Sequence, residues 1–259
     1  MFEYKEIDPP KPLEKFVHCL WVFEQSGGNL TDKIVPDGRP ELVVHIGEPY
    51  WEVSSGTQQP RVLFAGQLTK SLHIQARGSA SILAVRFRPD GAHRFLRSSV
   101  ASVTDKRLPM ASIAPGSEET LLQTINAQAD KLEQLSALGQ FVAARIGPAE
   151  PDHMVRALVE AALVNAPIEY PSHVRPRQVQ RRFKQATGVS LRTFRAIRRF
   201  RSVFDRMQAE EQESWVERAL EAGYFDQPQM ARDFQRFLGC SAREWVESAA
   251  GLGLALGTN

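Results

Sequence analysis

The sequence predicts an α+β protein whose N-terminal part is rich in strands and whose C-terminal part is all helical. Up to about residue 103, short apolar runs of β-branched and aromatic residues alternate with Gly, Pro and Asn, which is typical of strands joined by turns. Beyond residue 116, apolar residues recur at intervals of three and four, the period of an amphipathic helix. A dense basic segment, residues 175–206, lies within the helical part.

The composition is that of an ordinary globular protein of 259 residues, 42% hydrophobic and 24% charged, with a formal net charge of +2. No apolar run is long enough to span a membrane, and the acidic N-terminus does not resemble a signal peptide. The two cysteines, Cys19 and Cys240, lie far apart in the sequence. We therefore expect a cytoplasmic protein without a disulfide framework or a cysteine-based zinc site.

Five apolar runs predict the strands of the N-terminal part, which we take as a domain of residues 1–103. They cover residues 16–23, 41–46, 61–66, 72–77 and 81–87, and a short helix is expected at 91–96. Several short strands at this spacing favour a sandwich or a small barrel.

Three polar residues lie in or beside these apolar strands, namely His45, Gln67 and Arg86. Because the mouths of small barrels bind small ligands readily, we expect these three residues to line an effector pocket. The four histidines of this domain form no His-x-His pair, so neither a metal nor another cofactor is expected.

Residues 104–150 predict a helical connector. Its apolar stripe indicates one long helix or two shorter ones, and consists of Leu121, Leu122, Ile125, Ala129, Leu132, Leu135, Leu138, Phe141, Val142 and Ile146. The stripe packs either on the strands of its own chain or against a second copy in a homodimer. Two prolines in residues 147–152 indicate a domain boundary, which leaves residues 151–247 as a second domain and residues 248–259 as a flexible tail.

The basic segment carries eleven Arg and Lys residues against one acid, Asp205, a formal charge of about +10. A helix face of one charge is usually solvated, but self-repulsion makes so uniform a face unfavourable unless a polyanion binds it. Double-stranded DNA provides the matching charge density. Arg also suits DNA because its planar guanidinium fits phosphate oxygens and guanine edges.

Two helices of the C-terminal part repeat one pattern at an offset of 51 residues. The pairs are Val179 and Met230, Arg181 and Arg232, Phe183 and Phe234, and Gly188 and Gly239. Pro176 suits the first position of the first helix, and Asp226 suits the N-cap of the second. A long helix over residues 191–207 separates the first pattern from the second, and a further helix is expected over residues 215–222. Two copies of one helix-turn-helix unit account for this repeat.

Residues from about 155 to 245 closely resemble the double helix-turn-helix domain of AraC/XylS-type transcription regulators. The second unit carries the resemblance in Ala222-Gly223-Tyr224-Phe225-Asp226-Gln227, in Arg232-Asp233-Phe234, in Phe237-Leu238-Gly239-Cys240-Ser241 and in Trp245. The first unit carries it in residues 177–183 and 188–190. It departs from the pattern between residues 168 and 175, where Pro171 shortens the expected positioning helix and Arg175 replaces a Ser.

The N-terminal part more loosely resembles an uncharacterised sensor domain that precedes this DNA-binding domain in some regulators. The matching residues are 36–43, 65–67 and 85–89. That resemblance implies a cupin-like domain that binds an effector or mediates dimerisation.

The family resemblance also implies roles for ten residues of the C-terminal part. The residues expected to contact bases are Arg177, Gln180 and Arg181 in the first unit and Gln227, Gln229 and Arg232 in the second. The residues expected to contact phosphates are Arg182, Lys184, Arg198 and Arg236. Arg and Gln can make bidentate hydrogen bonds to guanine and adenine edges, each contributing about 1–3 kcal/mol of discrimination.

The sequence therefore predicts a sequence-specific transcription regulator and not an enzyme. Its expected partners are double-stranded promoter DNA, a small-molecule effector, a second copy of the chain and, for an activator, RNA polymerase. Two alternatives remain open at this point. The first is a cupin-type enzyme tethered to DNA, and the second is a nucleic-acid binder without sequence preference.

Overall fold

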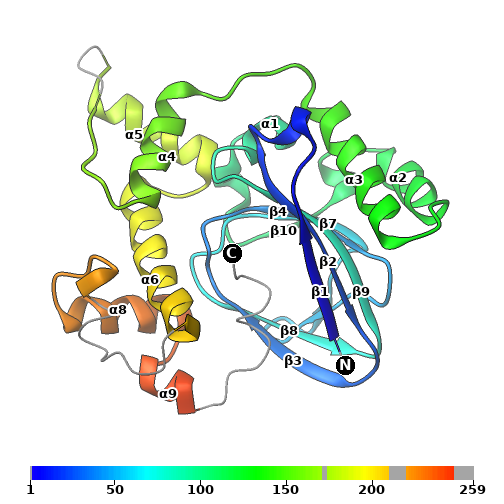
Figure 1. Ribbon diagram of the computed structural model, residues 1–259, viewed down its shortest axis with the longest axis horizontal. Helices are drawn as coiled ribbons and strands as arrows, with labels where there is room; N and C mark the ends of the chain where they lie inside the picture. Colours follow the sequence, from blue (N-terminus) through cyan, green and yellow to red (C-terminus); the bar gives the residue numbers. More distant parts are fainter. Residues whose placement is uncertain (1, 171–173, 210–219, 248–259) are drawn as a thin grey trace.

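The computed structural model describes residues 2–170, 174–209 and 220–247. Two antiparallel β-sheets form the N-terminal domain, and the helices that follow residue 152 pack at one end of them (Figure 1). The predicted α+β class with a sandwich-like N-terminal domain is confirmed. Among the described residues, no helix is both long and apolar enough to cross a bilayer.

The larger sheet has six strands in the order β1-β2-β9-β4-β7-β10. They are β1 (Phe2–Ile7), β2 (Val17–Gln25), β9 (Ala80–Phe87), β4 (Glu41–His45), β7 (Val62–Ala65) and β10 (Arg107–Pro109). The smaller sheet has the order β3-β8-β5-β6. Its strands are β3 (Asn29–Ile34), β8 (Leu72–Arg77), β5 (Trp51–Glu52) and β6 (Thr57–Gln58). All five strands expected from the apolar runs are present.

Strand β9 is apolar along most of its length because both of its faces are buried. Leu83, Val85 and Phe87 pack in the core beneath the helices, whereas Ile82 and Ala84 pack in the core between the two sheets. Successive side chains of a strand point to opposite faces, so one continuous apolar run serves two cores.

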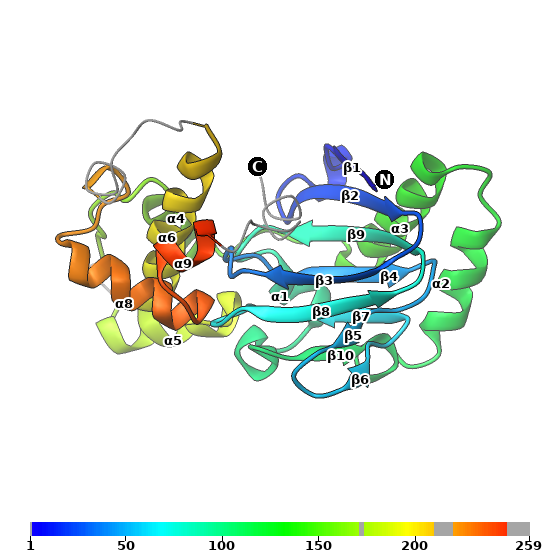
Figure 2. The ribbon, with the colours of Figure 1, turned by 90° about the horizontal axis from the view of Figure 1, so that it is seen from below.

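Helices α1 (Ala92–Leu96), α2 (Ser117–Asn126) and α3 (Lys131–Ile146) cover the outer face of the larger sheet. In Figure 2 the helices α2 and α3 lie at the opposite end of the sheets from the C-terminal helices. The apolar stripe of the connector, including Leu121, Leu135 and Val142, packs in the core of this sheet. Most of the stripe therefore packs within the chain, whereas Ala129 and Leu132 are exposed. Short 3-10 helices, Lys11–Leu13, Val100–Val103 and Met110–Ser112, complete this part of the fold.

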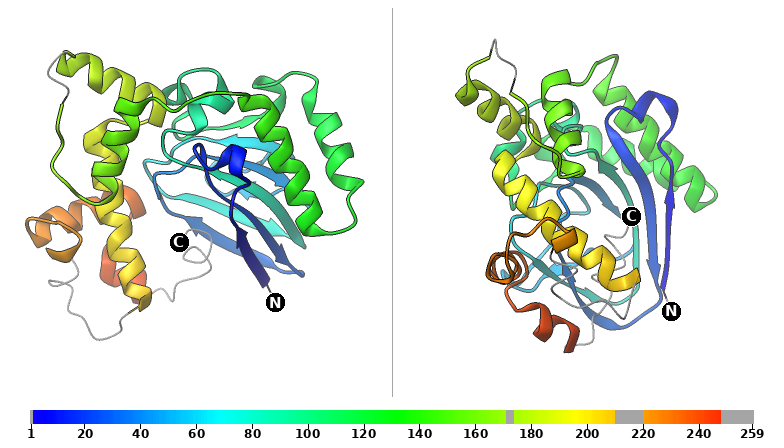
Figure 3. Two further views of the ribbon diagram at one scale, coloured as in Figure 1. Left: turned by 45° about the horizontal axis from the view of Figure 1, so that its top comes forward. Right: turned by 60° about the vertical axis from the view of Figure 1, so that its left-hand side comes forward.

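The described residues of the C-terminal domain form α4 (His153–Leu163), α5 (Pro176–Thr187), α6 (Leu191–Ala209), α8 (Gln227–Leu238) and α9 (Ala242–Glu247). Helix α6 runs between two groups of helices and contributes to two cores (Figure 3). Leu191 and Phe194 pack with α4 and α5, whereas Ile197 and Phe200 pack with α8 and α9. The expected helix over residues 215–222 lies mostly outside the described residues, and the expected tail, residues 248–259, lies entirely outside them.

Candidate nucleic-acid interface and ligand cavity

Helix α5 presents a basic surface because its apolar residues all lie on one side. Val179 and Phe183, four residues apart, are buried against α4 and α6. The helix begins at Pro176 and ends at Gly188, whose φ of +91° is the left-handed conformation that glycine adopts without strain. On the outward side, the three predicted base-contacting residues are exposed, namely Arg177, Gln180 and Arg181.

Helix α8 repeats this arrangement with a stronger N-terminal cap. The Asp226 carboxylate accepts a hydrogen bond from the backbone N–H of Gln229 at 2.6 Å, and the Gln229 Oε1 accepts one from the N–H of Phe225 at 3.0 Å. These reciprocal bonds resemble a capping box. Gln227 and Arg232 are exposed, whereas Gln229 is half-buried. The structure thus gives Gln229 a capping role, in addition to the base contact that the sequence predicts.

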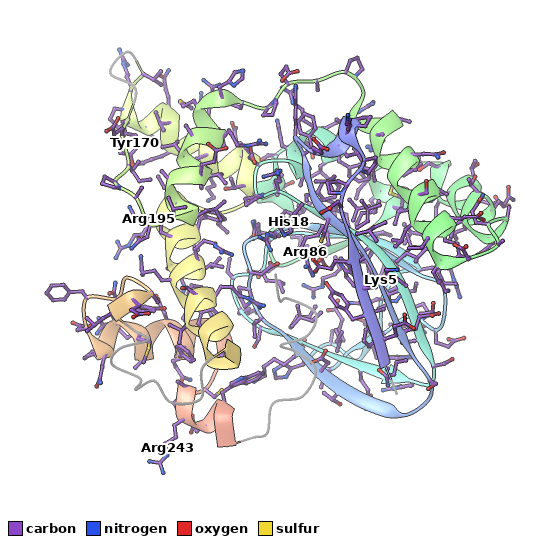
Figure 4. The ribbon with its side chains drawn as sticks, viewed as in Figure 1. Lys5, His18, Arg86, Tyr170, Arg195 and Arg243 are labelled. Carbon is purple, nitrogen blue, oxygen red and sulfur yellow. The ribbon has the colours of Figure 1, made fainter. Side chains whose placement is uncertain are left out.

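A basic groove of about 630 Å³ lies between α5 and α8. Gln180 of α5 and Gln229 of α8 line it, so two predicted base-contacting residues from different units meet in one surface feature. Three arginines of α6 also line it, namely Arg192, Arg195 and Arg199. The Arg195 guanidinium donates to the Asn165 Oδ1 at 2.8 Å, and its side chain points away from the sheets, on the side of Tyr170 (Figure 4).

The three groove arginines were not among the predicted phosphate contacts. Their spacing of three and four residues places them on one face of α6, a pattern that is readable in the sequence. Arg198 and Arg201 lie on another face of the same helix. The Arg198 guanidinium donates to the backbone carbonyl of Asp37 in the N-terminal domain at 3.3 Å. The structure therefore places Arg198, a predicted phosphate contact, at an interdomain contact.

The other predicted phosphate contacts have different surroundings. Lys184 and Arg236 are exposed, and the Arg236 guanidinium lies over the Phe237 ring, 4.9 Å from its centroid. Arg182 donates to the Asp152 carboxylate at 2.6 Å. Asp152 also caps α4 by accepting from the N–H groups of Met154 and Val155. Arg182 therefore links α5 to the start of α4.

Both helical units contact the N-terminal domain. The Thr104 hydroxyl donates to the carbonyl of Gly188, at the end of α5, at 2.7 Å. Lys33 and Ser71 both donate to the carbonyl of Leu238, at the end of α8, at 3.3 Å. Because these bonds involve the C-terminal ends of both helices, the N-terminal domain helps to fix the orientation of the two units while the basic faces stay exposed.

A cavity of about 80 Å³ lies between the two sheets of the N-terminal domain. Its walls are mainly apolar and include Trp21, Val43, Tyr50, Leu63 and Ile74, and Arg39 and Arg201 also line it. Arg201 belongs to α6 and is only 2% exposed, so the C-terminal domain contributes one wall of a cavity in the N-terminal domain.

Of the three residues predicted to line an effector pocket, the structure places His45 on the cavity wall. Burial lowers the pKa of His45 to about 4, so the imidazole is neutral at physiological pH. Gln67 is buried outside the cavity lining, where its amide donates to the carbonyl of Gly38.

Arg86 also lies outside the cavity lining but contacts a residue that belongs to it. Its guanidinium binds the carboxylates of Glu41 and Glu6, each at 2.7 Å, and Glu41 lines the cavity. Arg86 therefore holds Glu41 in place from behind the cavity wall, and Figure 4 labels the position of Arg86. No group of three or more His, Cys, Asp or Glu side chains suited to a metal occurs in the described ranges.

Two similar helical units with exposed basic helices form the arrangement of a double helix-turn-helix DNA-binding domain. Residues 172–248 match the model of a helix-turn-helix domain, and residues 5–109 match that of a domain of unknown function (DUF6597). The C-terminal domain is therefore a helix-turn-helix domain.

The solved structures that the chain matches are remote in sequence. ToxT from Vibrio cholerae O395 is 9% identical over 96% of this chain and 98% of its own, with a TM-score of 0.43. The same protein bound to (E)-4-(8-methylnaphthalen-1-yl)but-3-enoic acid is 8% identical over 95% of this chain and 98% of its own, with a TM-score of 0.43. The AraC-like transcriptional activator CuxR is 12% identical over 85% of this chain and 91% of its own, with a TM-score of 0.27. A search of curated proteins finds no match.

Proposed function

We propose that this chain is a transcription regulator of the AraC/XylS type that reads promoter DNA with α5 and α8, and that a small molecule bound in the cavity controls this binding. Arg201 carries the proposal because it connects the two domains. It belongs to α6, which packs with both helical units, and it lines the cavity of the N-terminal domain. A ligand that contacts the Arg201 guanidinium therefore acts directly on the position of α6 relative to the sheets.

The cavity lining favours a ligand with an apolar body and a polar head group. Trp21 and Tyr50 provide apolar walls, Arg201 is a cationic donor, and Glu41 contributes a carboxyl group. A guanidinium group donates hydrogen bonds and accepts none, so a head group that contacts Arg201 must carry an acceptor oxygen or nitrogen. The small volume limits the occupant to a compact molecule.

On the DNA side, the exposed arginines and glutamines of α5 and α8 support the predicted base contacts. Each recognition helix enters a major-groove segment with its N-terminal part, as in other helix-turn-helix proteins. The groove arginines of α6, namely Arg192, Arg195 and Arg199, then face the phosphates between the two segments. Their charge offsets phosphate charge by releasing counterions.

The remaining predicted partners belong to the same proposal. The regulator acts in the cytoplasm without a catalytic step, contacts RNA polymerase if it activates transcription, and forms a homodimer. Most of the apolar stripe of the connector is buried in the core of its own chain, whereas Ala129 and Leu132 are exposed. We therefore place the homodimer contact outside the buried part of the stripe.

The ligand proposal is tested by the thermal stability of the full chain in a panel of compact alcohols, ketones, esters and carboxylates. A compound that binds only the folded chain stabilises it by about 2.7 kcal/mol at a concentration one hundred times its Kd. Val43 lines the cavity, so Val43→Phe should fill it and abolish this response. A compound that stabilises the wild type and Val43→Phe equally would show that it binds elsewhere.

Arg201→Met is expected to uncouple ligand binding from DNA binding. With a stabilising compound, the DNA affinity of the wild type should change about fivefold or more, whereas that of Arg201→Met should change less than about twofold. Tyr50→Phe is the matched control because Tyr50 lies on the cavity wall within the N-terminal domain. This control should bind the compound more weakly but keep the full change in DNA affinity at saturation. Undiminished coupling in Arg201→Met would contradict the proposal.

A further inference from the structure

Phe225 is an apolar side chain that the fold leaves in solvent. It is 90% exposed, more than any other large hydrophobic residue among the described ones. It directly precedes Asp226, the N-cap of α8, and therefore lies at the end of the recognition helix that carries Gln227 and Arg232. Single exposed apolar residues are common on protein surfaces. The exposure of Phe225 is informative because this residue directly precedes the N-cap of the recognition helix.

In the first helical unit, the residue at the equivalent position packs against the core. Val174 is the equivalent of Phe225 at the offset of 51 residues, and it packs against the core that contains Val179. A hydrophobic residue before the N-cap that packs with one at the fourth helical position is a hydrophobic staple. In the second unit, Met230 is the buried residue at that position, yet Phe225 is exposed and is not part of the core that contains Met230.

The backbone on both sides of Phe225 is nevertheless held in place. Its N–H donates to the Gln229 side chain, and the preceding Tyr224 is only 3% exposed. Gly223 adopts φ +82°, and a Cβ there would come within 2.2 Å of the Asn165 side-chain nitrogen, so this turn fits closely against the first unit. Phe225 is thus an apolar group presented from a fixed backbone.

We infer that Phe225 is a specificity-determining residue that contacts the 5-methyl group of a thymine in the major groove. The inference rests on the proposed reading of DNA by α8. The thymine methyl is the one apolar feature that base pairs present in the major groove. A rigid aromatic ring ahead of the recognition helix adds apolar recognition to the hydrogen bonds available from Gln227 and Arg232.

The test begins with in vitro selection of a consensus duplex by the full-length wild-type chain from random DNA. Each thymine of the consensus is then replaced by deoxyuridine, which lacks only the methyl group, and Kd is measured for wild type, Phe225→Ser and Val53→Ser. Val53 is 50% exposed in the N-terminal domain and controls for the loss of an exposed apolar side chain. Thermal unfolding of both variants controls for folding.

For the wild type, deoxyuridine at one position should weaken binding about fourfold, because burying one methyl or methylene group contributes about 0.8 kcal/mol. Phe225→Ser should bind the consensus about tenfold more weakly and no longer distinguish thymine from uracil at that position, a coupling that a double-mutant cycle measures. Val53→Ser should behave as wild type. The inference is overturned if Phe225→Ser keeps wild-type affinity, as expected for a protein-docking residue, or keeps the discrimination. Failure of the wild type to select any consensus would instead overturn the reading of DNA itself, and with it the inference.

Discussion

A chain that carries Arg181→Ala and Arg232→Ala together is expected to bind its selected duplex about 2–6 kcal/mol more weakly than the wild type. Each arginine is exposed on its recognition helix, and a bidentate contact to guanine contributes about 1–3 kcal/mol. Because the two residues lie on different helices, α5 and α8, their losses should add. Fluorescence anisotropy at one fixed salt concentration measures both the single and the double variants.

The same measurement on random duplexes separates base contacts from phosphate contacts. The double variant should lose much less affinity for random DNA and should tolerate substitutions at two positions of the consensus. Lys184→Ala is the control from α5, since this exposed lysine should weaken binding to all sequences alike and lower the salt slope by about one. An equal loss on consensus and random DNA would assign the two arginines to phosphates.

Phe234→Ala is expected to lower the free energy of unfolding of the second unit by about 3–5 kcal/mol, the usual effect of removing a buried phenylalanine. Phe234 is fully buried, and its ring meets that of Phe200 edge to face with centroids 5.1 Å apart. The variant therefore loses both apolar burial and an aromatic pair. Denaturant unfolding followed by circular dichroism measures the change.

Gln235→Ala is the matched control for this prediction. Gln235 is the next residue on α8 and is exposed, so its replacement should change stability by less than about 0.5 kcal/mol. A loss below about 1 kcal/mol in Phe234→Ala would mean that α8 does not depend on the core it shares with α6.

The strands that could be predicted were those buried on at least one face along their length. Apolar runs predict β2, β4, β7, β8 and β9, whereas no apolar run predicts β1 or β3. The sequences Phe2–Ile7 and Asn29–Ile34 contain several charged residues, and both strands lie at sheet edges. Edge strands tolerate charge because one side is open to solvent. Their pairing depends on a neighbouring strand that a local pattern does not reveal.

The candidate site could be predicted where the helical period alone determines which side of a helix is buried. Val179 and Phe183 fixed the buried side of α5, and so its exposed basic side. The family resemblance implies a phosphate contact for Arg198. The helical period does not show which side of α6 the N-terminal domain covers, and on that side Arg198 donates to the Asp37 carbonyl. Likewise, no local sequence pattern distinguishes His45, which lines the cavity, from Arg86, which lies behind the cavity wall. Both assignments depend on how the domains and sheets pack.

The central claim is that α5 and α8 read two neighbouring major-groove segments at a separation set by α6. Helix α6 has 19 residues and a length of about 28 Å, comparable to one turn of DNA, about 34 Å. The most direct test is to insert about half a turn of DNA, roughly five base pairs, between the two halves of the selected site and to measure Kd. The account predicts a loss of at least about tenfold, because only one recognition helix can then reach its bases. An unchanged affinity would contradict it.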